Sequence, residues 1–261
     1  MTEPLDRRIA DTLPAPGRAL AWWLGQNGFV VRGRRGIVLV DPFVSDSISS
    51  GLRPYTHERL VPPVLELGDR EGIEPEAVLI THEHVDHCDN VYLTRLAAMT
   101  SCRFVGSPAV RDRLRSWGIP EDRIETVRPG AVVRAEYGEV EATDAVHVPG
   151  AVGFIVRLAD GPTLYFAGDT GLFLGMRDLG ARKLDAAFLP INGQDDNLGI
   201  DGALIATSWL GAPIVVPTHY GMFADNTERP ERLAHRVVAA GLPARVAIIA
   251  HAEMFEVEAR G

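Results

Sequence analysis

The chain has 261 residues, of which 46% are hydrophobic and 23% charged, as is typical of a globular protein with a substantial core. Its net charge of −9 argues against a broad nucleic-acid footprint and against attachment to an anionic membrane, so neither partner is expected. No apolar run is long enough to cross a bilayer, and the start of the chain lacks the apolar centre of a secretory signal. Two cysteines, Cys88 and Cys102, are too few for a disulfide framework, so a cytoplasmic location is expected.

Strand-like apolar runs recur along the whole chain and are mixed with helix-like segments. Strands are predicted over 19–25, 28–33, 36–42, 77–82, 103–107, 131–135, 140–147, 152–158, 163–169, 186–191, 214–220, 245–251 and 254–258. Helices are predicted over 90–100, 107–118, 201–211 and 228–241, with Asn90 and Ser107 as candidate caps of the first two. This mixture favours an α/β layered fold in which helices cover sheets. Since no linker divides the chain, one domain over 1–261 is expected.

The stretch LITHEHVDHCDN at 79–90 holds three of the eight histidines, together with an aspartate: His82, His84, Asp86 and His87. Imidazole and carboxylate are the usual ligands of divalent metals in proteins. Alternate residues of an extended segment point the same way, so His82 and His84 can face one pocket. Asp86 and His87 follow in the turn before a helix, where they can face a second point beside the first. The density of these groups favours a site for two neighbouring metals over an ordinary polar loop.

Three other predicted strands end on residues of the same kind. His147 ends the run VEATDAVH, Asp169 follows a glycine in TLYFAGDT, and His219 follows IVVPT. Taken alone, each has a plain interpretation, as a buried histidine or a turn aspartate. Because each follows an apolar strand, each is expected at a sheet edge, where loops gather and sites form. Together with the cluster at 82–87 they predict one rim of five histidines and two aspartates.

The strings HEHVDH, TDAVH, FAGDT and PTHY, in this order, resemble the metallo-β-lactamase superfamily. The resemblance covers almost the whole chain and implies a four-layer αββα sandwich, two sheets flanked by helices. The strings AWWLGQNGFVV, VLVDPF and LPINGQDDNLGIDGALIATSWLGAPIVVPTHYG are similar to the branch that contains L-ascorbate-6-phosphate lactonase and related metal-dependent hydrolases. The short loop VPGA after His147 differs from that lactonase and argues against ascorbate 6-phosphate as the substrate.

Carried over position by position, the resemblance implies two divalent metal ions per chain. His82, His84 and His147 would hold the first ion, Asp86, His87 and His219 the second, and Asp169 would bridge them. Nitrogen and oxygen ligands suit zinc or manganese. Iron is less favoured, because His84 stands where the diiron branch of the superfamily carries a glutamate.

These ligands imply hydrolysis, in which a hydroxide that bridges the metals attacks a small ester-like substrate, foremost a lactone. Asp86 is the expected catalytic residue, which both holds the second metal and orients the nucleophile. Two alternatives stay open. One is a phosphodiesterase for small phosphodiesters or a nuclease-like activity, and the other is a metal-dependent binding module without turnover. Assembly into a homo-oligomer is compatible with the fold, although nothing in the sequence sets the number of subunits.

Substrate selection is expected to come from loops around the rim. The segment 44–72 is rich in Ser, Gly, Pro and charge and is a candidate lid, with Arg53, Tyr55 and His57 as candidate contacts. Further candidates lie in INGQDDN, which follows the strand predicted from AAFLP, and at the end of the predicted strand IVVPTHY: Asn192, Gln194, Asp195, Asn197 and Tyr220. The polar groups of INGQDDN have an equally plain alternative, which is to cap the helix predicted near Asp201.

Overall fold

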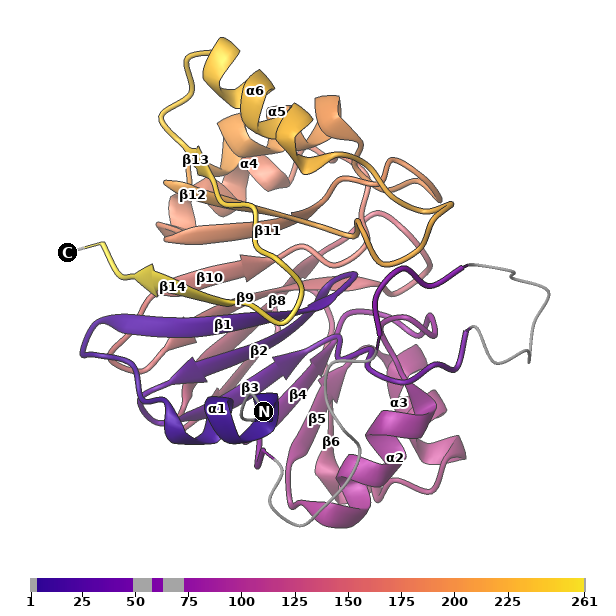
Figure 1. The fold of residues 1–261 in the computed structure, drawn as a ribbon. Helices are drawn as coiled ribbons and strands as arrows, with labels where there is room; N and C mark the ends of the chain where they lie inside the picture. The colour runs from indigo at the N-terminus through magenta and orange to yellow at the C-terminus, as the bar shows by residue number, and fades with distance from the viewer. Residues whose placement is uncertain (1–3, 49–57, 63–72, 261) are drawn as a thin grey trace.

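A computed structural model describes residues 4–48, 58–62 and 73–260. Within them, two seven-stranded sheets pack face to face, and helices cover both outer faces (Figure 1). The predicted four-layer αββα sandwich is therefore confirmed. Strand β14 (Met254–Glu258), near the end of the chain, pairs with β1 (Arg18–Gly25) near its start. One domain over 1–261 stays a prediction, and the pairing of β14 with β1 is consistent with it.

The first sheet has the strand order β14-β1-β2-β3-β4-β5-β6. Its strands β14 to β3 pair antiparallel, and β3 to β6 pair parallel. The bounds of its other strands are β2 Gly28–Gly33, β3 Gly36–Val40, β4 Ala77–Ile80, β5 Arg103–Gly106 and β6 Ile124–Thr126. Strands β1, β3, β4 and β5 consequently all run in one direction.

The second sheet has the order β13-β12-β11-β10-β9-β8-β7 and the same division into two halves. Strands β7 to β10 pair antiparallel, and β10 to β13 pair parallel. The bounds are β7 Val132–Ala135, β8 Gly138–Asp144, β9 Val152–Leu158, β10 Thr163–Phe166, β11 Ala186–Pro190, β12 Ile214–Thr218 and β13 Arg245–Val246. Strands β8, β10, β11 and β12 therefore share one direction.

Helices from the two halves of the chain cover different sheets. The first set, with Ile9, Leu93 and Leu114 in the core beneath it, packs on the first sheet: α1 Leu5–Asp11, α2 Asn90–Met99 and α3 Pro108–Ser116. The second set covers the other sheet: α4 Met176–Leu179, α5 Ile200–Leu210 and α6 Pro230–Ala239. Two short 3₁₀ turns complete the description: η1 Glu121–Arg123 and η2 Gly180–Arg182. No helix in the described ranges has the length and apolar character needed to span a bilayer.

Alternation along the central strands creates two cores. In β1, Ala19, Ala21 and Trp23 point into the core between the sheets, whereas Leu20, Trp22 and Leu24 point under the helices. Because side chains of a strand alternate between faces, a strand buried on both sides reads as a continuous apolar run. Phe29 of β2 lies across the sandwich from Phe188 of β11, with ring centroids 4.7 Å apart, and so joins the two sheets.

Some predicted boundaries are wrong. The strand expected over 245–251 ends at Val246, its last residue paired with β12. Helix α2 is capped by Asp89 rather than Asn90, since the Asp89 side chain accepts from the backbone N–H of Tyr92. Ser107 caps α3 as expected. The short elements α1, β6 and α4 were not predicted.

Candidate metal centre

The predicted metal-binding positions follow strands that end at one edge of the sandwich. His82 lies just beyond β4, His147 beyond β8, Asp169 beyond β10 and His219 directly after β12. The shared strand direction in each sheet carries all these chain segments to the same edge. The turn between β1 and β2 and the end of β3 reach this edge too, because β1 and β3 run the same way as β4.

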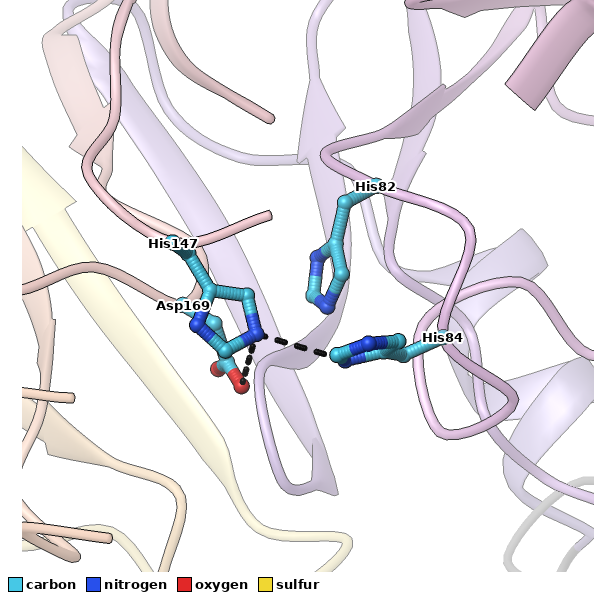
Figure 2. Close-up of side chains that lie close together, drawn as sticks. All are labelled: His82, His84, His147 and Asp169. Atoms are coloured by element: carbon cyan, nitrogen blue, oxygen red, sulfur yellow. Dashed lines mark hydrogen bonds and ion pairs between the residues drawn. The ribbon is translucent and has the colours of Figure 1, made fainter. Parts of the chain in front are cut away.

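All seven predicted residues come together there, in two groups. The first group is His82, His84, His147 and Asp169, and the second is Asp86, His87 and His219. Within each group the potential ligand atoms lie within 4.8 Å of one another. Figure 2 shows the first group, with its four side chains directed at a common point. His147 Nε2 lies 3.3 Å from His84 Nδ1.

Asp169 lies between the two groups. Its Oδ1 is 3.4 Å from His87 Nε2, while its Oδ2 is 3.4 Å from His219 Nε2 and 3.8 Å from His147 Nε2. The preceding Gly168 has φ +62°, and a Cβ there would come within 2.7 Å of the Thr81 side chain. The glycine thus allows the strand after β10 to approach the β4 loop, which brings Asp169 into reach of both groups.

Asp41, directly after β3, orients two of the histidines. This buried carboxylate accepts from the Thr81 backbone N–H at 2.8 Å and the Thr81 hydroxyl at 2.7 Å, and it lies 2.8 Å from His87 Nδ1. Since the Thr81 hydroxyl has one proton and donates it to Asp41, it accepts from His82 Nδ1, 3.1 Å away. Both His82 and His87 therefore carry a proton on Nδ1 and direct Nε2 at the centre.

Burial and mutual charge shift the pKa values of these groups in opposite directions. Burial alone would raise the pKa of Asp169, yet His219 and His87 beside it bring that pKa well below its ordinary value. Burial would lower the pKa of His219, but Asp169 and Asp86 raise it to about 9. For His82 burial dominates, reinforced by His87, and its pKa falls well below the ordinary value.

The donor set fits divalent metal ions. Among the described residues, His82 Nε2 and His87 Nε2 are fully buried and have no hydrogen-bond partner. A buried polar nitrogen without a hydrogen-bond partner is costly, and a metal ion would supply the missing interaction. Their Nδ1 atoms are held by Thr81 and Asp41, as is usual for histidines that bind metals.

Comparison with known proteins identifies the family. A model of the β-lactamase superfamily domain matches residues 37–220. The chain belongs to the β-lactamase superfamily. A metal-dependent hydrolase of Thermoplasma acidophilum is 30% identical over 221 residues, covering 80% of this chain and 87% of that protein. A metal-dependent hydrolase of Pyrobaculum islandicum is 31% identical over 222 residues, covering 83% of this chain and 91% of that protein.

A solved metallo hydrolase of the archaeon Ignicoccus hospitalis has a similar structure, with a TM-score of 0.74 and 25% identity. The match covers 93% of this chain and all of that chain. Together with the sequence relatives, this assigns the chain as a metal-dependent hydrolase of the superfamily. The predicted superfamily is therefore confirmed.

Three residues of the centre are not among those predicted from the sequence. Besides Asp41, they are Gln26 and Asn27 in the turn between β1 and β2: Gln26 Nε2 donates to Asp86 Oδ2 at 3.0 Å, and Asn27 Nδ2 to Asp169 Oδ1 at 2.6 Å. The signal for Asp41 was present, since it directly follows the apolar run GIVLV. Nothing in the local pattern marks the amides, because their position depends on the direction of β1 within the sheet.

The polar loop INGQDDN does not cap helix α5, because the N-cap is Gly199 and no side chain bonds to that helix start. Its amides instead bond to the loop after His219: Asn192 Nδ2 donates to Asn226 Oδ1 and Gln194 Nε2 to the carbonyl of Asp225, each at 2.8 Å. Asn197 is buried, and its amide has no partner among the described residues. Asp195 is exposed, with φ +50°.

The remaining candidates contribute less to the centre. The Tyr220 hydroxyl donates to the carbonyl of Ile249, and its ring lies 4.6 Å from that of Trp23, so the side chain is used in packing. Cys88 is buried, and burial raises the pKa of its thiol, which agrees with a packing role. Arg53, Tyr55, His57 and most of the expected lid at 44–72 lie outside the described residues.

Proposed function

We propose that the chain is a two-metal hydrolase of small ester-like substrates, with lactones as the leading class. The observation that carries the proposal is that the buried Nε2 atoms of His82 and His87, one in each group, have no hydrogen-bond partner among the described residues and have Asp169 between them. The superfamily membership supports hydrolysis, and the net charge of −9 disfavours long nucleic acids as substrates.

In this proposal the two ions are zinc or manganese, and each group of side chains holds one. His82, His84 and His147 hold the first ion, Asp86, His87 and His219 hold the second, and Asp169 is shared. The position of Asp169 suits a shared ligand, since its Oδ2 lies near His147 of the first group and its Oδ1 and Oδ2 lie near His87 and His219 of the second. Nitrogen and oxygen donors without thiolate are compatible with either metal.

When bound, the metals supply positive charge that lowers the pKa of water to about 7 and stabilises the oxyanion formed from the substrate carbonyl. The side chains then position the reactants. Burial would raise the pKa of Asp86, but His87 and His219 bring it far below its ordinary value, so the carboxylate stays ionised at neutral pH. An ionised Asp86 can accept a hydrogen bond from the nucleophile and so orient it, without taking the proton of the nucleophile.

The proposal is tested by comparing metal-loaded wild type with Asp169→Ala on a panel of lactones and a panel of small phosphodiesters. Asp112→Ala is the matched control, because Asp112 is an exposed aspartate whose ion-pair partner is Arg111 and not a candidate ligand. We expect lactone opening in wild type and the control, and loss of that activity in Asp169→Ala. Cleavage of phosphodiesters alone would refute the lactone assignment. Two bound metals with no turnover on either panel would favour a binding module.

A further inference from the structure

The tip of the β1–β2 hairpin approaches both acidic residues of the centre. Gln26 and Asn27 are adjacent in the chain, yet their amides reach different carboxylates: Gln26 Nε2 lies 3.0 Å from Asp86 Oδ2, and Asn27 Nδ2 lies 2.6 Å from Asp169 Oδ1. Both residues are buried, with exposed fractions of 0% and 5%, so water does not compete freely for the hydrogen bonds of these amides. Each carboxylate thus has one N–H donor from the same two-residue turn.

The backbone of the turn is held in a conformation that directs these amides. Gln26 has φ +47°, a left-handed conformation that non-glycine residues keep only where surrounding contacts require it. Its carbonyl accepts two hydrogen bonds of 3.0 Å, from the indole N–H of Trp23 and from the backbone N–H of His219. Because one of these donors belongs to a candidate ligand, the hairpin tip is fixed directly to the second group.

Local contacts also determine which side of each amide faces the carboxylates. The Thr218 hydroxyl donates to Asn27 Oδ1, so the Asn27 N–H side is the one directed at Asp169. The Gln26 amide nitrogen lies 3.3 Å from both ring nitrogens of His219, in addition to its bond to Asp86. An ionised carboxylate only accepts hydrogen bonds, so an amide must turn its nitrogen toward it.

We propose that Gln26 and Asn27 are positioning residues that set the orientation of Asp86 and Asp169 for metal binding; this inference rests on the proposed two-metal function. Asn27 takes one lone pair of Asp169 Oδ1, which holds Oδ2 toward His219 and His147. Gln26 acts on Asp86 and therefore on the second group alone. Asn27 acts on the shared carboxylate and therefore on both groups.

This difference gives a specific expectation for metal affinity. Removing a hydrogen-bonding partner of a ligand typically weakens metal binding about 10- to 100-fold. Gln26→Met keeps the side-chain length and removes the donor, so one of the two affinities should fall by about this factor while the other is unchanged. Asn27→Leu keeps the shape and removes the donor, so both affinities should fall.

The experiment is a titration of the metal-free protein with zinc in competition with a chromophoric chelator. Asn192→Leu is the matched control for Asn27→Leu, because the Asn192 amide donates to Asn226 Oδ1 rather than to a candidate ligand. Gln194→Met is the control for Gln26→Met, since the Gln194 amide bonds to the carbonyl of Asp225 rather than to a candidate ligand. Both controls should retain the two wild-type affinities.

Unchanged zinc affinities in Gln26→Met and Asn27→Leu, with wild type binding two zinc ions, would overturn the positioning role and leave the proposed function intact. A wild type that binds only one zinc would instead refute the two-metal proposal, and Asn27→Leu would still test the inference at that one site. If either variant fails to fold by circular dichroism, Gln26→Asn and Asn27→Ser provide smaller changes with the same readout. If Gln26 and Asn27 had a purely structural role, Gln26→Met and Asn27→Leu would lower the melting temperature to a similar extent, and neither would change one zinc affinity without the other.

Discussion

The two groups of the centre differ in charge although both are rich in histidine. His82, His84 and His147 have no carboxylate of their own and share only Asp169, whereas His87 and His219 lie beside both Asp86 and Asp169. Burial lowers the pKa of His82 and His84, while the neighbouring carboxylates raise that of His87 and His219 against burial.

Because of this difference in charge, the two groups would not bind metal in the same way. In the metal-free protein the first group offers neutral imidazoles at His82 and His84, so a cation displaces no proton from these two residues. In the second group a metal competes with protons for His87 and His219, so its binding must release them. The second group also carries most of the supporting contacts, from Asp41 and Gln26.

The largest effect is expected where the groups meet. Asp169→Ala removes the one carboxylate near histidines of both groups, so we expect the protein to lose both metals and hydrolysis to fall to background. Metal content after gel filtration, measured by elemental analysis alongside activity, checks this. Retention of one full equivalent of metal would show that one group binds its metal without Asp169. Asp169 would then not be a ligand that both groups need.

A pair of histidine variants sharpens the comparison. His84→Ala should remove one metal and His219→Ala the other, each with an affinity loss greater than the roughly 10- to 100-fold of a supporting residue. In the remaining site of His84→Ala, zinc affinity should depend strongly on pH, whereas in His219→Ala it should depend weakly. Zinc titrations at several pH values measure this, and identical pH profiles would contradict the assigned asymmetry.

Asp41→Asn tests the contacts behind the histidines. The amide can still accept a hydrogen bond but lacks the charge that holds the proton on His87 Nδ1, so we expect zinc affinity to fall about 10- to 100-fold. Burial raises the pKa of Asp41, and the neighbouring His87 offsets only part of this rise. Asp160→Asn, at an exposed aspartate that pairs with Arg35, is the control and should bind zinc normally.

The smallest effect is a pH dependence of the metal-free protein. The pKa of His219 is raised from 6.5 to about 9 in the folded state, so its contribution to stability is complete below about pH 6.5 and is lost as the pH rises through about 9. The melting temperature of chelator-treated protein should therefore fall over this range. The metal-free His219→Ala protein should show a smaller fall, and equal slopes would argue against the His219–Asp169 pair.

Much of the architecture was predictable from local pattern, because strands buried on both faces give continuous apolar runs that are visible along the chain. The same runs marked the positions of His147, Asp169 and His219, since each follows a strand. Short elements such as β6 and α4 escaped prediction, because three or four residues carry too little periodicity. The end of β13 at Val246 depends on its pairing with β12, which an apolar run alone does not record.

By itself the sequence determined an α/β fold and the seven residues that gather at one edge, because ligand chemistry is dense at 82–87 and follows strand ends elsewhere; its resemblance to the superfamily implied the αββα arrangement. Only the tertiary structure decided what surrounds them. Gln26 and Asn27 have no ligand chemistry, and they reach Asp86 and Asp169 because β1 runs in the same direction as β4 within one sheet. Strand direction is set by pairing between distant segments, which no local pattern records.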